Sequence, residues 1–179
     1  MKIGVLSDSH KNLLYLRKAL ELLLKENVSF LIHLGDDYSD TKILDEYPIA
    51  NIKVPGVFDP EYKDSNIKNR RIEEIAGFYF LISHTKTSHK NDQSTDLIPE
   101  DIISNGGIDI VLFGHTHLYE IKKENEIIFF NPGHLQEIDA KGRSATYGIC
   151  EINDEIIFSI HSLDGNCLLK EAFPKCKRG

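Results

Sequence analysis

The apolar residues of the chain fall mostly into short continuous runs, a pattern typical of strands buried on both faces. One segment differs, because its leucines recur every three or four positions with charged residues between them, which predicts an amphipathic helix over residues 12–26. Shorter helices are predicted over residues 39–46 and 97–105. The apolar runs predict strands over residues 2–6, 29–34, 49–54, 78–83 and 109–113, and a weaker alternation predicts another over 66–75.

The order strand, helix, strand at the start of the chain predicts two parallel strands joined by a right-handed crossover. From residue 118 the pattern changes to short strands separated by turn residues, which is typical of antiparallel hairpins. Two mixed sheets packed face to face, with helices outside, would accommodate both halves. We expect one domain over residues 1–173 and a flexible tail over 174–179. The late strands are predicted over residues 118–123, 126–130, 144–152, 155–162 and 168–173.

Polar residues that are costly to bury follow most of the apolar strands. Asp8 and His10 end the first strand, and their spacing makes both side chains of an extended chain point the same way. In such sheets ligands bind beyond the carboxyl ends of the strands, so we expect the strand-end residues to gather there. These residues are Asp8, His10, Asp36, His84, His115 and His117, and a rigid loop carries Asp59.

The types of these residues point to a metal site. Carboxylate and imidazole ligands without thiolate suit Mn²⁺, Fe, Zn²⁺ or Ni²⁺ and are less apt for Ca²⁺. His115 and His117 cannot easily share one ion from an extended segment, so each could serve one of two adjacent ions, and Asp36 could bridge both. Two divalent ions ~3.5–4 Å apart would clamp a phosphoryl group and generate hydroxide at neutral pH.

Composition narrows the class of protein. With 41% hydrophobic and 27% charged residues, the chain of 179 residues is ordinary for a globular domain. A net charge of −7 argues against extended nucleic-acid binding but allows a small phosphate ester as substrate. Three cysteines without C-x-x-C spacing suit a reducing cytosol. Without a signal peptide or membrane span we expect a cytoplasmic protein, and exposed hairpin edges could pair two chains as a homodimer.

The ordered motifs Asp8-x-His10, Gly35-Asp36, His84 and Gly114-His115-Thr116-His117 resemble the calcineurin-like metallophosphoesterases, above all their small single-domain phosphodiesterase branch in bacteria and archaea. Asn131-Pro132-Gly133 is similar to the Asn-Pro-Gly-Ser turn of that branch, with His134 where serine is usual. The resemblance implies an α/β fold, namely a four-layer αββα sandwich of two mixed β-sheets flanked by helices. It also implies phosphodiester hydrolysis by a hydroxide that bridges two metal ions, manganese among the candidates. Asp8, His10 and His117 would hold one ion, His84 and His115 the other, and Asp36 both.

One motif departs from the family pattern. The family has Gly-Asn-His-Asp/Glu where this chain has Gly56-Val57-Phe58-Asp59, so Val57 replaces a metal ligand and Phe58 replaces the general acid of many members. We expect a weaker second metal site and low activity on poor leaving groups, since losing a leaving-group acid typically costs ~10²–10⁴-fold in rate. Gly-x-Phe-Asp also resembles the retromer scaffold subunit, a non-enzymatic relative. The alternative function is therefore a weakened or inactive relative that acts as a metal-binding protein-interaction scaffold.

Catalytic roles are predicted for three residues, of which Asp36 is also a predicted metal ligand. His134 could contact the substrate or donate a proton, and Asp59 could orient its loop or reach the site through water.

Other polar residues have a structural interpretation beside a functional one. His89 is expected at the surface but could replace the missing acid, and Arg143 could meet a substrate phosphate or lie in a solvated turn. His33 and His161 are expected to be structural. Asp37 and Asp40 are expected to begin a helix in solvent.

Overall fold

The computed structural model describes residues 1–175, which form two β-sheets. The first sheet has the order β11-β10-β9-β1-β2-β3 and the second has the order β4-β5-β6-β8-β7. The strands of the first sheet are β1 (Lys2–Leu6), β2 (Phe30–His33), β3 (Ala50–Lys53), β9 (Thr146–Ile152), β10 (Glu155–Ser162) and β11 (Cys167–Pro174). Those of the second sheet are β4 (Arg70–Ile75), β5 (Phe78–Ser83), β6 (Ile110–Leu112), β7 (Glu120–Glu124) and β8 (Ile127–Asn131).

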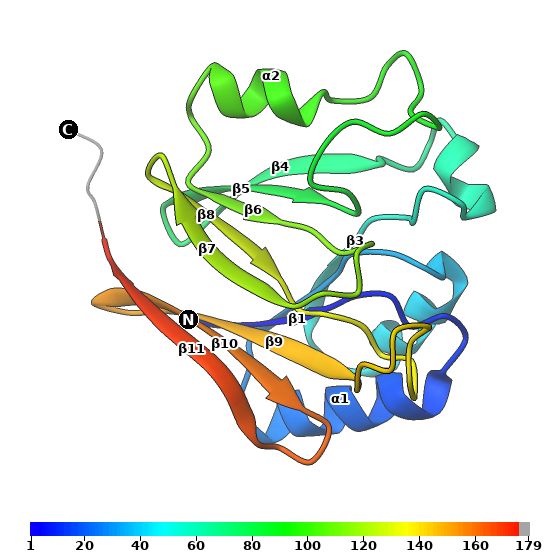
Figure 1. The fold of residues 1–179 in the computed structure, drawn as a ribbon, viewed down its shortest axis with the longest axis vertical. Helices are drawn as coiled ribbons and strands as arrows, with labels where there is room; N and C mark the ends of the chain where they lie inside the picture. The colour runs from blue at the N-terminus through cyan, green and yellow to red at the C-terminus, as the bar shows by residue number, and fades with distance from the viewer. Residues whose placement is uncertain (176–179) are drawn as a thin grey trace.

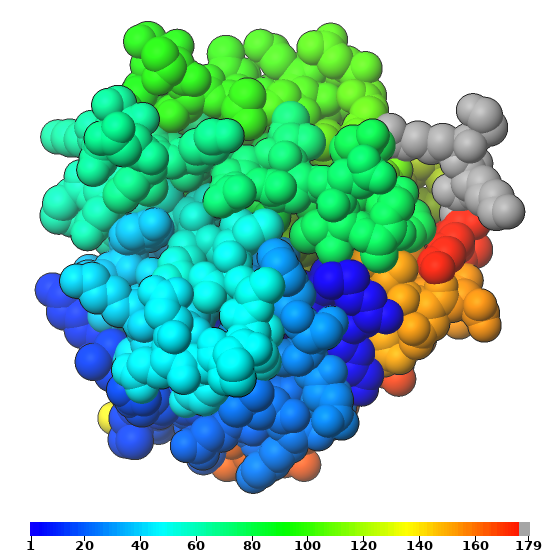
Figure 2. Space-filling model, turned by 180° about the vertical axis from the view of Figure 1, so that it is seen from behind, coloured from blue at the N-terminus to red at the C-terminus, as the bar shows by residue number. Residues whose placement is uncertain are grey.

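Helices cover the outer face of each sheet, so the chain is built in four layers (Figure 1). The helix α1 (Leu13–Lys25) and the 3₁₀ segment η1 (Tyr38–Glu46) pack on the first sheet, and α2 (Pro99–Ser104) packs on the second. From behind, the first third of the chain forms the lower part of the molecule and the segment drawn in green forms the upper part (Figure 2). The predicted four-layer sandwich of two mixed sheets flanked by helices is confirmed.

The main hydrophobic core lies between the two sheets, where Ile3 and Val5 of β1 belong to the same buried cluster as Phe80 and Ile82 of β5. Burial of each such side chain contributes about 1.5–3 kcal/mol to folding. Since these residues alternate along their strands, their neighbours face the helices on the other side. The core therefore holds the two sheets in one fixed relation, and the ends of their strands can contribute to a single site.

The helix α1 forms where the leucine spacing predicts it. Asn12 precedes the helix and its side chain accepts a hydrogen bond from the Tyr15 backbone N–H, which satisfies one of the free donors of the first turn. Leu16, Leu20 and Leu23 lie on one face and are buried against the first sheet. The helix joins β1 to β2, which pair in parallel, so the predicted βαβ unit is confirmed.

The hairpins of the last third divide between the two sheets. β7 and β8 join the second sheet, where β8 pairs in parallel with β6, whereas β9, β10 and β11 join the first sheet through β9 and β1. The alternation of the chain predicts each hairpin. It does not predict the sheet that receives the hairpin, because a strand that is apolar on both faces fits either one.

Several elements differ from the predictions, among them β4, which begins at Arg70 instead of residue 66, and α2, which spans Pro99–Ser104 instead of 97–105. The 3₁₀ segment η2 (Pro60–Lys63) was not predicted, and the short helix predicted over 39–46 is the 3₁₀ helix η1 over Tyr38–Glu46. β11 continues through Pro174, which pairs with Glu155, so the predicted tail begins one residue too early. The rest of that tail, apart from Lys175, lies outside the described residues. In the described part of the chain, no helix has the length and apolar character needed to cross a membrane.

His33 is buried in β2, where its Nδ1 accepts a hydrogen bond from the Gly35 backbone N–H. Burial lowers the pKa of His33 to about 4, so the folded protein keeps the ring neutral at pH 5, where an unfolded chain protonates it. Stability should therefore be lost as the pH falls from about 6.5 toward 4, by about 2 kcal/mol between pH 7 and pH 5 for this group alone.

We predict that His33→Asn removes this part of the pH dependence, because an amide oxygen can replace Nδ1 as acceptor and does not titrate. Urea unfolding of both proteins at pH 7 and pH 5 measures the effect. If both proteins lose the same stability between these pH values, His33 is not the source of this pH dependence.

Candidate metal centre

The six strand-end residues lie together at the carboxyl edges of the sheets, in two groups. Within each group, one potential ligand atom of every residue lies within 4.8 Å of the others. Each group draws on both sheets, since β1 and β2 supply the acids whereas β5 and β6 supply the partners from the second sheet. The first group is Asp8, His10 and His117, and the second group is Asp36, His84 and His115.

Asp8, in the first group, has the geometry of a metal ligand. Its Oδ2 accepts hydrogen bonds from the Ser7 hydroxyl and from the His115 backbone N–H, at 3.0 Å for the latter. Its Oδ1 is buried, has no hydrogen-bond partner among the described residues and lies 3.4 Å from His117 Nε2. Gly114 passes so close that a Cβ there would meet Asp8 Oδ2. A bare, buried carboxylate oxygen beside imidazole nitrogens is costly alone and fits a bound cation.

His84 is oriented in the same way in the second group. Its Nδ1 donates to the Leu34 carbonyl at 2.7 Å, so the neutral ring presents the lone pair of Nε2. That atom lies 3.1 Å from His115 Nδ1 and 3.4 Å from Asp36 Oδ2. In the first group, His10 Nε2 and His117 Nε2 are similarly 3.0 Å apart. Imidazole nitrogens that converge on a carboxylate fit a divalent transition metal.

Asp36 lies between the two groups. Its Oδ2 is 3.4 Å from His84 Nε2 and 3.9 Å from His10 Nε2. A Cβ at Gly56 would collide with the Asp36 carboxylate, so glycine is required for the β3 loop to pass this close. The position is compatible with the predicted bridging role of Asp36.

Most of the six residues have an unusual backbone. A non-glycine residue with positive φ is uncommon and carries strain, and such residues cluster at functional sites. Half of the ten non-glycine residues with positive φ in the described part of the chain belong to the two groups. They are Asp8 (54°), His10 (45°), Asp36 (47°), His115 (67°) and His117 (59°). The chain turns sharply after each strand, and this turn aims the side chains at one place.

The metal-free site balances its charges internally. Burial opposes a charge on His84, but the carboxylates of Asp36 and Asp8 outweigh this effect and raise the pKa of His84 to about 9. Burial likewise opposes ionisation of Asp8 and Asp36, yet the histidines around them hold both carboxyl pKa values below the usual range. Ligands must be deprotonated to bind a metal, so an ion bound to the second group would displace the His84 proton.

Asp40 was predicted to begin a helix in solvent, and this prediction is wrong. Its side chain is buried and its Oδ2 accepts hydrogen bonds from the Ser9 hydroxyl and the Lys11 backbone N–H, both at 2.8 Å. Asp40 therefore holds the turn between Asp8 and His10. No sequence pattern predicts a contact between residues 9 and 40. Asp37 is half-buried and belongs to neither group.

Asn131 holds the loop that carries His115 and His117. Its side-chain amide donates to the Gly114 carbonyl at 2.9 Å and to the Thr116 hydroxyl at 3.1 Å. Its Oδ1 accepts a hydrogen bond from the Gly133 backbone N–H. The sequence reveals the Asn-Pro-Gly turn as a motif but not this role, which depends on β8 lying beside β6.

Asp59 belongs to neither group. Its Oδ2 accepts hydrogen bonds from the backbone N–H groups of Gly56 and Tyr38, at 2.6 and 2.9 Å. Burial, with help from the nearby charge of Asp36, raises the pKa of Asp59 to about 6. Of its two predicted roles, these contacts fit the one that orients the loop.

His134 lies beside the first group, with its ring centroid 5.1 Å from that of His117. Its Nδ1 accepts a hydrogen bond from the Gln136 backbone N–H, so the neutral ring carries its proton on Nε2. Nε2 is buried and has no partner in the described chain. A donor of this kind beside a metal site is suited to a substrate oxygen.

Arg143 lies partly buried near the same group, not in a solvated turn. Its guanidinium pairs with Asp139, which also lies 3.9 Å from His117 Nδ1, and donates to the Thr116 carbonyl at 3.3 Å. The backbone N–H of Arg143 and its guanidinium overcome the effect of burial and hold the pKa of Asp139 well below its usual range. Asp139 was not identified from the sequence.

The segment Gly56-Val57-Phe58-Asp59, which departs from the family pattern, lies against the second group. Val57 is buried, and its carbonyl accepts a hydrogen bond from the Asn91 side chain. Phe58 is exposed and its ring contacts His89 and His115, with centroid separations of 5.6 and 6.4 Å. His89 is half-buried, and its ring centroid lies 5.9 Å from that of His115. It is therefore closer to the candidate metal centre than the predicted surface position implies. His161 lies away from the site, stacked on Tyr147.

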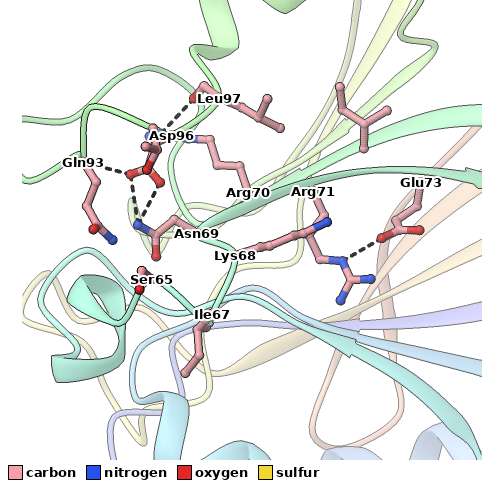
Figure 3. Close-up of a pocket in the computed structure, with 12 residues that line it drawn as sticks. Ser65, Ile67, Lys68, Asn69, Arg70, Arg71, Glu73, Gln93, Asp96 and Leu97 are labelled. Carbon is pink, nitrogen blue, oxygen red and sulfur yellow. Dashed lines mark hydrogen bonds and ion pairs between the residues drawn. The ribbon is translucent and has the colours of Figure 1, made fainter.

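A cavity of about 480 Å³ lies elsewhere, along the free edge of β4 (Figure 3). Some of its polar groups are paired with one another, as Figure 3 shows for Asn69 with Asp96 and for Arg71 with Glu73. None of the six candidate ligands lines this cavity.

Comparison with known proteins relates the chain to phosphoesterases. A sequence model of the calcineurin-like phosphoesterase superfamily domain matches residues 1–155. Phosphodiesterase MJ0936 of Methanocaldococcus jannaschii is 31% identical over 147 residues, which cover 74% of this chain and 83% of that protein. Phosphodiesterase YfcE of Escherichia coli K12 is 24% identical over an alignment of 192 positions, which covers 96% of this chain and 97% of that protein.

Solved structures share the fold. The phosphoesterase YfcE from E. coli has a TM-score of 0.71 at 23% identity, covering 97% of this chain and 100% of that one. Vacuolar Protein Sorting 29 from Cryptosporidium parvum has a TM-score of 0.73 at 17% identity, covering 97% and 98%. At such identities the likeness shows the fold alone.

We predict that Asp59→Ala destabilises the protein by about 2–4 kcal/mol, because the buried N–H of Gly56 and the partly buried N–H of Tyr38 both lose their acceptor. Asp59→Asn should recover most of that loss, since its amide oxygen can accept both hydrogen bonds. Urea unfolding measures the stability of each variant, and a phosphodiester assay measures its activity. An Asn variant as stable as the parent but as inactive as the Ala variant would instead assign Asp59 a direct catalytic role.

Proposed function

Because this chain belongs to the calcineurin-like phosphoesterase superfamily, we propose that it is a metal-dependent hydrolase of phosphodiesters. The observation that carries the proposal is the pair of ligand groups at the sheet edges, in which the bare Asp8 Oδ1 and the imidazole nitrogens converge. The curated relatives at 24–31% identity are phosphodiesterases, which supports the same substrate class.

The proposal assigns one divalent transition metal ion to the first group and one to the second, with Asp36 shared. Mn²⁺, Ni²⁺, Fe and Zn²⁺ all suit these nitrogen and oxygen donors. When bound, such ions act as Lewis acids on phosphoryl oxygens and lower the pKa of water enough to supply a nucleophile near neutral pH.

The protein's own groups prepare this site. Asp40 and Asn131 hold the two ligand-bearing loops, and the Leu34 carbonyl keeps His84 in the tautomer that presents Nε2. His134 offers its Nε2–H to a phosphoryl or leaving-group oxygen. Phe58 supplies no proton, so the enzyme should favour substrates whose leaving group departs without one, such as aryl diesters.

The scaffold alternative is not favoured. A protein-interaction scaffold has no need for an unpaired buried carboxylate oxygen or for five ligand-type residues in a left-handed backbone. The departure at Val57 and Phe58 affects the second group and leaves the first intact. Homodimer formation and a cytoplasmic location stay predictions.

Two metal ions per chain and hydrolysis of bis(p-nitrophenyl) phosphate are expected of the protein after loading with Mn²⁺ or Ni²⁺. His10→Ala and His115→Ala should each lower the count to one, as measured by elemental analysis, and should reduce kcat/KM by at least about 100-fold. His161→Gln is the control, because this histidine belongs to neither group, and it should keep both ions and full activity.

Each outcome of this experiment has a distinct meaning. Two ions without hydrolysis of the aryl diester would refute the phosphodiesterase and support the metal-binding scaffold, and no ion at all would refute a metal-dependent enzyme. One ion that is lost in His10→Ala but kept in His115→Ala would show a mononuclear enzyme.

We further predict that Val57→Asn strengthens the second site. The side chain of Val57 offers no ligand atom, whereas an amide oxygen at that position restores one. The variant should reach full activity at about tenfold lower metal concentration. Val57→Thr, which has nearly the same shape but lacks the amide, is the matched control and should show no gain. An equal metal dependence of Val57→Asn and the parent protein would mean that the loop does not bring this position to the second ion.

A further inference from the structure

A second cavity, of about 520 Å³, opens directly beside the first group. His117 lines it, so the cavity and the candidate metal centre share a wall. It lies where the second sheet ends at β7 and the first ends at β11, two edge strands that approach each other (Figure 1). The other lining residues are Leu118, Tyr119, Arg143, Ser144, Thr146 and Leu168.

The wall of this cavity is unusually apolar for an exposed surface next to a charged site. Leu118, Tyr119 and Leu168 are 52, 45 and 48% exposed, although a folded chain gains by covering such side chains. They come from two segments about 50 residues apart, the loop before β7 and the start of β11. Large apolar groups gathered around a concave surface mark a binding site for an apolar group.

Two features orient an occupant relative to the metal centre. Arg143 contributes a guanidinium at the His117 side, where its Nη1 is buried and has no hydrogen-bond partner among residues 1–175. Tyr119 presents a half-exposed aromatic ring, and aromatic groups pack favourably on such rings in offset or edge-to-face arrangements. An anion near His117 joined to an aromatic group between Tyr119 and Leu168 would match both features.

We propose that this cavity is a specificity subsite that binds an aromatic ester group of the substrate, either an aryl group or a nucleobase-bearing alcohol. The inference rests on the proposed function, because it assigns the phosphoryl group to the metal centre. Tyr119 and Leu168 are specificity residues in this view and take no part in bond breaking. Leu168 lies beyond residue 155, where the match to the family model ends.

Equilibrium binding tests the subsite without depending on turnover. Calorimetry on the metal-loaded protein compares phenylphosphonate with methylphosphonate, which differ only in the group that the cavity would receive. The parent protein should bind phenylphosphonate about tenfold more tightly, since burial of an apolar group of this size is worth at least that factor. Tyr119→Ala and Leu168→Ala should each reduce the preference to about threefold or less, and the double variant should abolish it.

The matched control is Leu14→Ala, which removes an exposed leucine of α1 that does not line the cavity and should leave the preference unchanged. Both cavity side chains are about half exposed, so the variants should fold, and thermal unfolding checks this. Equal affinity of the parent for the two phosphonates, or an undiminished preference in the double variant, would overturn the subsite.

Hydrolysis of bis(p-nitrophenyl) phosphate separates the subsite from the proposed function. If the parent hydrolyses this diester and the double variant keeps the phenyl preference, the subsite is wrong and the phosphodiesterase stands. If the preference depends on Tyr119 and Leu168 but the diester is not hydrolysed, the subsite stands and the proposed reaction is wrong.

Discussion

The hydrogen bond from the His115 backbone N–H to Asp8 Oδ2 joins the carboxyl edges of the two sheets, and the candidate site depends on it. A second cross-sheet bond, from His84 Nδ1 to the Leu34 carbonyl, acts beside it. The first bond leaves Oδ1 of Asp8 bare, and the second turns Nε2 of His84 toward Asp36. These two hydrogen bonds, which join the sheets, therefore also select which ligand atoms are free. A shift of either sheet would disturb both groups together.

This arrangement is costly to the folded chain. Buried carboxylates and imidazoles lose hydration, and five residues with positive φ carry backbone strain. The large core between the sheets and the leucine face of α1 stabilise the fold and offset this unfavourable free energy. Charge pairing reduces the cost further, with His84 held protonated by Asp36 and Asp8. A metal ion that binds the folded state alone would stabilise it by mass action.

The two sides of the centre differ in what they offer a substrate. Near the second group, the loop of Val57 and Phe58 supplies neither a ligand atom nor a proton, and its fixed shape depends on Asp59. Near the first group, His134 offers an unpartnered N–H and the cavity of Tyr119 and Leu168 offers an apolar wall. Our proposals therefore place substrate recognition and proton supply at the first group, which keeps all of its ligand-type residues.

The sequence by itself determined the strands, the leucine helix, the four-layer sandwich and the six strand-end residues, because each depends on local periodicity or on a motif of a few residues. Only the tertiary structure decided which sheet each late hairpin joins, since an apolar strand can pair with either. It also decided the roles of Asp40, Asn131 and Asp139, whose contacts join Ser9 to Asp40, Asn131 to Gly114 and Asp139 to His117 across the fold. A hydrogen bond between distant residues leaves no periodic trace in the chain. The sequence alone therefore predicted Asp8 and His10 as a pair of ligands. The role of the Asp40 carboxylate, which holds the turn between them, depends on how the folded chain packs residue 40 against that turn.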